Sequence, residues 1–167
     1  MRAMKIILRI ISIVLTVLLA FILCFNLYMI AAKRIFKVRQ PTVLGFSCAI
    51  VATGSMSGSI KPDDLIITRK RDRYEIGDII TYYGKTSTVT HRITNITADG
   101  FITKGDANNA PDPVAVKPAD IVGKVVLIVP RFGETAEFFS SAFGLILLAV
   151  GIFIISALPT AINRFSK

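Results

Sequence analysis

Three short stretches of this sequence carry residue types that can act together in nucleophilic catalysis. Ser55 lies between a glycine and a methionine, His91 is the single histidine of the chain, and Asp106 and Asp112 lie in a turn-rich segment further along. A serine hydroxyl needs a positioned base to become a nucleophile, and imidazole titrates in the right range for that role. A carboxylate can orient the imidazole and stabilise its protonated form. These residue types indicate a Ser-His-Asp hydrolase.

Each of these residues also has an ordinary structural interpretation. Ser55 can belong to a plain Gly-Ser turn. His91 alternates with Val89 and Ile93, so it can be a core histidine bonded to a backbone carbonyl, and the two aspartates can be solvated loop residues. One histidine excludes a multi-histidine metal site. The hydrolase interpretation therefore depends on the stretches occurring together.

Charge divides the chain into a balanced middle and basic ends. Residues 61–137 hold all eleven acidic residues and eleven of the twenty Lys and Arg residues, so they carry no net charge. The net charge of +9 comes entirely from residues 2–39 and 164–167. A nucleic-acid-binding face needs its excess charge on the folded domain, whereas basic residues beside apolar segments are typical of contact with anionic lipid headgroups. We expect a lipid bilayer as a partner and no nucleic acid.

Two uncharged segments have the length and composition of membrane-spanning helices. The first covers residues 10–32, which as a helix extends about 35 Å, and the second covers residues 138–158. A cleavable signal peptide has a shorter apolar core. We predict an N-terminal membrane anchor at 1–35, a peptidase domain at 40–135 and a C-terminal transmembrane helix at 138–160.

The charges beside the second segment predict its orientation. Glu134 and Glu137 precede it, and Arg164 and Lys167 follow it, so the positive-inside rule places the C-terminus in the cytoplasm. Basic residues on both sides of the first segment leave its orientation undecided. Two crossings then make this a multi-pass protein of the cell membrane with its middle domain on the extracytoplasmic side.

The middle of the chain has the pattern of a mostly β domain. Short apolar or alternating runs are separated by turn signals such as Gly77-Asp78, Gly84-Lys85 and Asp99-Gly100. No stretch of this region has a convincing helical period. We predict a compact, antiparallel β domain between two transmembrane helices. The expected strands lie at 43–52, 65–68, 79–83, 86–97, 101–104 and 121–129.

Four motifs in this region resemble those of the signal peptidase I family. The similarity is to its endoplasmic-reticulum-type branch, which also occurs in archaea and in some spore-forming Gram-positive bacteria. The motifs occur in family order and are specific as a set. They are Thr53-Gly54-Ser55-Met56-Ser57-Gly58, Gly77-Asp78-Ile79-Ile80, Thr90-His91-Arg92-Ile93, and Thr103-Lys104-Gly105-Asp106 with Asn108-Asn109 and Asp112. The family has Glu-Pro where this chain has Ser57-Gly58, and Gly-Asp where it has Asp63-Asp64.

The resemblance implies a serine endopeptidase that removes signal peptides from secretory preproteins without a metal or a cofactor. It implies Ser55 as the nucleophile, His91 as the general base and an aspartate as the third member. We favour Asp112 as the partner of the histidine and Asp106 in a supporting role. The expected substrates have small residues before the cleavage site. Whether accessory membrane subunits take part is not implied.

The residues around Ser55 complete the expected site. Its backbone N–H and the Thr53 hydroxyl are the expected oxyanion donors, and Met56 and Ile60 are expected to line shallow substrate pockets. Two other classes of protein stay open. One is a cysteine peptidase or transpeptidase that uses Cys48 and His91. The other is a non-catalytic, membrane-anchored β domain that binds a partner protein.

Overall fold

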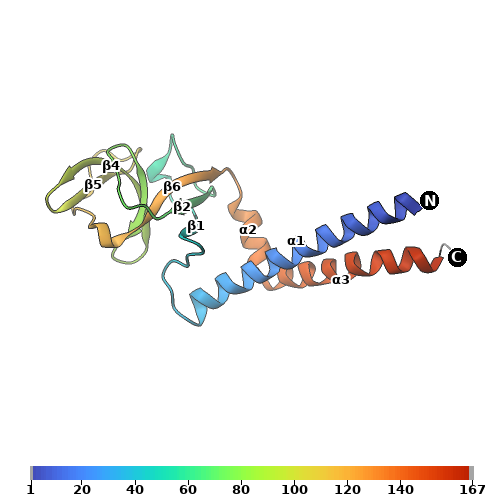
Figure 1. Cartoon of the computed structure of the whole chain (residues 1–167). Helices are drawn as coiled ribbons and strands as arrows, with labels where there is room; N and C mark the ends of the chain where they lie inside the picture. Colours follow the sequence, from blue (N-terminus) through green and yellow to red (C-terminus); the bar gives the residue numbers. More distant parts are fainter. Residues whose placement is uncertain (1, 166–167) are drawn as a thin grey trace. The chain divides into compact units, whose positions relative to one another are not determined.

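The computed structural model describes residues 2–165, which fold as two separate units (Figure 1). One unit is helical and consists of the chain up to Lys37 and from Ala136 onward. The other extends from Val38 to Thr135 and holds every strand that the structure describes. All the motifs noted above lie in this second unit, which we call the β domain.

The β domain contains one six-stranded antiparallel sheet in the order β1-β2-β6-β3-β4-β5. This confirms the predicted fold class. Five strand ends differ from the predicted ranges by one to three residues. The first strand starts later than predicted because the chain makes a tight turn at Leu44 and Gly45, both with positive φ. The fourth strand starts later because a Gly84–Ser87 hydrogen bond closes the turn before it. The strands are β1 (Phe46–Ile50), β2 (Leu65–Arg69), β3 (Ile79–Tyr83), β4 (Thr88–Thr97), β5 (Gly100–Lys104) and β6 (Ile121–Val129).

Apolar side chains pack against both faces of this sheet. Successive residues of a strand point to opposite faces, and β3 shows this directly. Ile80 belongs to one buried cluster, whose other members are Tyr74, Tyr82, Ile93, Val116 and Ile121. Ile79 packs against a second cluster, formed by Met56, Ile60 and Ile66. The sheet therefore has a small core on each side, and the second core includes residues that follow Ser55 directly.

The helical unit contains two helices long and apolar enough to cross a membrane. They are α1 (Arg2–Arg34) and α3 (Ala142–Phe165), and their candidate spans are Ala3–Ala32 and Ala142–Ala161. The apolar side chains of both spans are mostly exposed, which would be costly in water and suits lipid. These features are consistent with membrane anchoring.

The chain between the β domain and α3 is helical as well. A short helix, α2 (Gly133–Ser140), precedes α3, and Ser141 separates the two. The Ser141 hydroxyl accepts a hydrogen bond from the Gly144 N–H at 3.1 Å, which caps the start of α3. The predicted segment 138–158 therefore begins in α2, and α3 continues through Pro159.

Helices α1 and α3 lie side by side (Figure 1) and are joined by polar contacts. The Ser12 hydroxyl of α1 donates a hydrogen bond to the Ile155 carbonyl of α3 at 2.5 Å. The Ser140 hydroxyl, at the end of α2, donates to the Asn26 side-chain oxygen at 2.8 Å. Ser12 and Asn26 of the first apolar segment thus have partners within the helical unit, which is favourable in a hydrocarbon environment, whereas the buried Thr16 hydroxyl has none among the described residues.

Candidate active site

Ser55 lies in a single 3₁₀ turn, η1 (Gly54–Met56), that follows β1. The Ser57 N–H donates to the Gly54 carbonyl at 2.9 Å and closes the turn. Met56 is 1% exposed and Ile60 is completely buried, and burial of one such side chain is worth roughly 1.5–3 kcal/mol. The apolar residues on the far side of the turn therefore fix it to the core while Ser55 stays partly exposed.

His91 lies in β4, opposite Ile80 of β3, and is 7% exposed. Its Nε2 atom lies 3.2 Å from the Ser55 Oγ atom. Its Nδ1 atom lies 2.7 Å from the Asp112 Oδ2 atom. Both ring nitrogens thus contact residues that the sequence singled out, and the order serine, imidazole, carboxylate is that of a charge-stabilised acid–base triad.

Asp112 is held against β5 through its backbone and its side chain. Its N–H donates to the Thr103 carbonyl at 2.7 Å, and its Oδ2 atom accepts hydrogen bonds from the Thr103 hydroxyl at 2.6 Å and the Tyr82 hydroxyl at 2.9 Å. Burial alone would raise the pKa of Asp112, but the hydrogen bonds from its three side-chain partners outweigh burial and lower it. The carboxylate therefore stays ionised beside the imidazole.

Asp106 does not contact His91 and binds Arg92 instead. The Arg92 guanidinium donates to both carboxylate oxygens, at 2.9 and 2.7 Å, and the Ser59 hydroxyl donates to Asp106 at 2.6 Å. Hydrogen bonds from Arg92 hold the pKa of Asp106 below its ordinary value, and the same contact raises the pKa of Arg92. A further Arg92 N–H donates to the Gly77 carbonyl at 2.9 Å. This network ties β4 to the chain just after the serine turn.

The backbone of Gly105–Ala107 lies directly against the serine turn. The Ala107 N–H donates to the Ser55 carbonyl at 2.9 Å, and the Asp106 N–H lies 3.4 Å from the Met56 sulfur. A side chain at Gly105 would place its Cβ atom 2.5 Å from the Ser55 carbonyl oxygen, well inside van der Waals contact. Glycine is the one residue that allows this approach.

The residues expected to contact the substrate differ in their exposure to solvent. The Thr53 hydroxyl is exposed and lies 3.4 Å from the Ser55 Oγ atom, on the side open to solvent. Met56 and Ile60 are buried in the second core cluster. Their side chains therefore pack beneath the serine turn and do not form an exposed surface for substrate. Cys48 lies in β1, and both ring nitrogens of His91 are already engaged elsewhere.

Sequence reasoning missed the side chains that hold the two aspartates. Tyr82 and Thr103 bind Asp112, and Arg92 and Ser59 bind Asp106. Thr103 and Arg92 lie within quoted motifs, but no role was inferred for them. Strand alternation offered one signal, because Tyr82 shares a strand face with Ile80, which pairs with His91.

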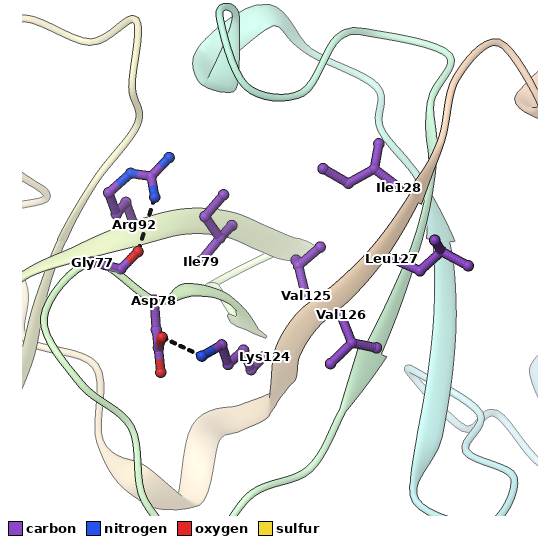
Figure 2. A pocket seen from close by; sticks show the side chains of 9 residues that line it. All are labelled: Gly77, Asp78, Ile79, Arg92, Lys124, Val125, Val126, Leu127 and Ile128. Carbon is purple, nitrogen blue, oxygen red and sulfur yellow. Dashed lines mark hydrogen bonds and ion pairs between the residues drawn. The ribbon is translucent and has the colours of Figure 1, made fainter.

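A groove of about 450 Å³ opens between the start of β3 and the second half of β6 (Figure 2). Ile79, Val125 and Ile128 line it and pack against the same core cluster, and Lys124 forms an ion pair with Asp78 at 2.5 Å. Neither Ser55 nor His91 lines the groove, which lies on the Ile79 face of β3, opposite the face of Ile80.

A relative of known name supports the resemblance seen in the motifs. The chain is 32% identical, over 113 residues, to a protein of Bacillus subtilis (strain 168) named "Signal peptidase I W". The aligned part covers 60% of this chain and 60% of the relative, so the chain spans less than two thirds of that protein's length. No protein-family model matches the chain. The four ordered motifs and this match support a place for the chain in the signal peptidase I family, in the branch that Bacillus represents.

Proposed function

We propose that this protein is a membrane-anchored serine endopeptidase that removes signal peptides from secretory preproteins. The observation that carries the proposal is the chain of contacts from the Ser55 hydroxyl through His91 to Asp112, at 3.2 and 2.7 Å. The similarity to a protein named signal peptidase I supports the substrate class. The two apolar helices support the membrane location.

The proposed reaction is acyl transfer through a covalent intermediate. His91 Nε2 accepts the Ser55 proton as the hydroxyl oxygen attacks the scissile carbonyl carbon. The protonated imidazole then gives this proton to the leaving amine, and the C–N bond breaks. Water attacks the acyl-enzyme with His91 as base again, which releases the new carboxylate and restores Ser55. Asp112 stabilises the imidazolium throughout.

Oxyanion stabilisation is assigned to two donors on the open side of Ser55. The Ser55 N–H is one, and the Thr53 hydroxyl, 3.4 Å from the Ser55 Oγ atom, is the other. Preorganised donors of this kind are each worth roughly 3–4 kcal/mol of transition-state stabilisation. Small substrate residues before the cleavage site are what the family resemblance implies for this location.

Cleavage of a co-expressed preprotein with an Ala-x-Ala site, in membranes, tests the proposal. Ser55→Ala should abolish processing, while Ser57→Ala, which changes a neighbouring serine of the same loop, should leave it intact. A serine-directed acylating probe should label Ser55. Processing by Ser55→Ala, or labelling of Cys48, would refute the mechanism. A wild-type protein that neither cleaves nor labels would favour the non-catalytic binding domain.

A further inference from the structure

Two buried hydroxyl groups converge on one oxygen of the Asp112 carboxylate, and the acyl-transfer chemistry uses neither of them directly. They belong to Thr103 of β5, which is fully buried, and to Tyr82 of β3, which is 8% exposed. Both hydroxyls contact the Oδ2 atom, the same oxygen that contacts His91 Nδ1. This carboxylate oxygen therefore has three side-chain partners from three different strands.

The proton count shows which group donates. Thr103 has a single hydroxyl proton, and its 2.6 Å contact with Asp112 is much shorter than its 3.3 Å contact with the Tyr82 oxygen. Thr103 therefore donates to Asp112. Tyr82 donates its own proton to the same oxygen at 2.9 Å. Burial, aided by the nearby carboxylate, raises the pKa of Tyr82 to about 12, so the phenol remains protonated wherever the triad works.

These two donors fix the orientation of the Asp112 carboxylate, which its own loop leaves free to rotate. Asp112 lies between Pro111 and Pro113 in a connecting segment, and its backbone is tied to β5 by one hydrogen bond, from its N–H to the Thr103 carbonyl. That bond leaves the carboxylate free to rotate about its side-chain bonds. Two fixed hydroxyls from the sheet select the rotamer in which Oδ2 meets the imidazole. Hydrogen bonds to a charged carboxylate are stronger than those between neutral groups, and two of them are enough for this selection.

We propose that Tyr82 and Thr103 are positioning residues of the triad, which act by orienting the Asp112 carboxylate and by sharing its negative charge. The kinetic consequence of this inference rests on the proposed peptidase function. The arrangement of the two hydroxyls around Asp112 is a property of the fold itself. Neither residue lies beside the Ser55 hydroxyl, so both act through Asp112 on His91. Their loss should lower kcat and leave KM nearly unchanged.

Loss of the donors should also loosen the hydrogen bond between His91 Nδ1 and Asp112. The carboxylate is then free to leave the rotamer in which its Oδ2 atom lies 2.7 Å from the ring nitrogen. The proton on Nδ1 should therefore exchange faster with water, and its NMR resonance should weaken.

The experiment compares Tyr82→Phe, Thr103→Val and the double variant with matched controls. Thr81→Val removes a buried threonine hydroxyl of β3 that pairs with Thr90, at 2.8 Å. Tyr74→Phe removes a tyrosine hydroxyl of the same core cluster that accepts the Arg71 N–H. Thr103→Ser restores the donor. All variants are made in the full chain in detergent micelles, with any histidine tag removed.

Two readouts are measured on each variant. Preprotein cleavage gives kcat and KM, and NMR of the single imidazole, labelled with ¹⁵N, gives the resonance of its Nδ1 proton without any assignment step. We expect kcat to fall about 10- to 100-fold in Tyr82→Phe and in Thr103→Val, with the Nδ1 proton resonance weakened. Thr103→Ser, Thr81→Val and Tyr74→Phe should match wild type in both readouts.

The two readouts separate the inference from the function on which it rests. If the wild-type protein cleaves nothing but Tyr82→Phe and Thr103→Val weaken the Nδ1 proton resonance, the positioning role stands and the peptidase function is refuted. If the wild-type protein is active but both variants keep the wild-type resonance, the positioning role is refuted and the peptidase function stands. Equal losses in the control variants would show that the hydroxyls only support the fold, which also overturns the inference.

Discussion

At the scale of single residues, the two aspartates have different surroundings and should respond differently to the same substitution. Asp112→Asn leaves an amide against His91 Nδ1, which favours the wrong tautomer, so kcat should fall by about 10⁴-fold. Asp106→Asn weakens a partly exposed pair with Arg92 and should cost about 10-fold. Cleavage assays on the two variants, with Asp99→Asn in a remote turn as the control, check this. A larger loss in Asp106→Asn would reverse the roles.

The lowered pKa values of these carboxylates predict acid lability. A carboxyl group whose folded-state pKa lies below its unfolded value stabilises the fold above the unfolded value, near pH 4. This contribution is lost as pH falls through the folded-state pKa. Asp112 and Asp106 both have lowered pKa values, so the β domain should lose stability below about pH 4.

Chemical unfolding of the full chain between pH 2.5 and 6 measures this dependence. Asp106→Asn should give a flatter curve than wild type, by about 1 kcal/mol or less because solvent screens this partly exposed pair. Glu137→Gln, which alters a carboxylate outside the sheet, should follow the wild-type curve. A wild-type curve with no decline below pH 4 would contradict the sign of both shifts.

The residue types and motif order single out Ser55, His91, Asp106 and Asp112 as candidates, but they do not determine the contacts between them. Which aspartate meets the imidazole depends on how the Pro111–Pro113 segment lies along β5, and no periodicity encodes a loop path. The roles of Tyr82 and Thr103 depend on the register between neighbouring strands. A two-residue error in the position of the β3–β4 turn, such as the predicted strand start at residue 86, is enough to give the wrong register. The local sequence around Tyr82 and Thr103 does not indicate the role of either residue.

At the scale of elements, the close contact between Gly105 and the serine turn predicts a position-specific effect. Gly105→Ala would place its Cβ atom 2.5 Å from the Ser55 carbonyl oxygen, so the contact between the two segments must open and the position of Ser55 relative to His91 should change. We expect kcat to fall at least about 100-fold, because nucleophile and base must stay within hydrogen-bond reach. Cleavage kinetics and thermal unfolding are measured together.

A second glycine provides the matched control for this steric change. Gly123→Ala would place its Cβ atom 2.7 Å from the Arg69 backbone, a similar clash within the sheet but away from the serine turn. It should lower the unfolding temperature and leave kcat of the folded protein near wild type. If both variants lose stability and activity in equal proportion, the Gly105 contact has no special role at the site.

Element prediction succeeded where a single pattern dominates and failed where tertiary contacts decide. The runs at 79–83 and 121–129 match β3 and β6, because apolar alternation and long β-branched runs leave no competing structure. The first strand is three residues shorter at its start because the chain turns at Leu44, whose positive φ is rare for leucine. The break at Ser141 needs a side-chain cap, which uncharged composition does not reveal.

At the scale of the whole molecule, we predict that both candidate spans cross the membrane, which would put the start of α1 and the end of α3 on one side and the β domain on the other. Arg164 and Lys167 after the second span predict cytoplasmic termini by the positive-inside rule, and Glu134 and Glu137 before it agree. A peptidase that acts on exported chains must have Ser55 on the outer side, where those chains emerge. Charge and proposed function therefore predict the same orientation.

Cysteine labelling in intact cells tests this orientation. In a Cys24→Ser, Cys48→Ala background, Asp99→Cys in the β4–β5 turn should react with a membrane-impermeant maleimide, whereas Ala3→Cys at the start of the first span should not. After lysis the Ala3→Cys protein should react as well, which controls for intrinsic reactivity. Labelling of Ala3→Cys but not Asp99→Cys in intact cells would invert the topology. A cytoplasmic β domain would also separate Ser55 from exported substrates, so this outcome would count against the proposed function as well as against the charge rule.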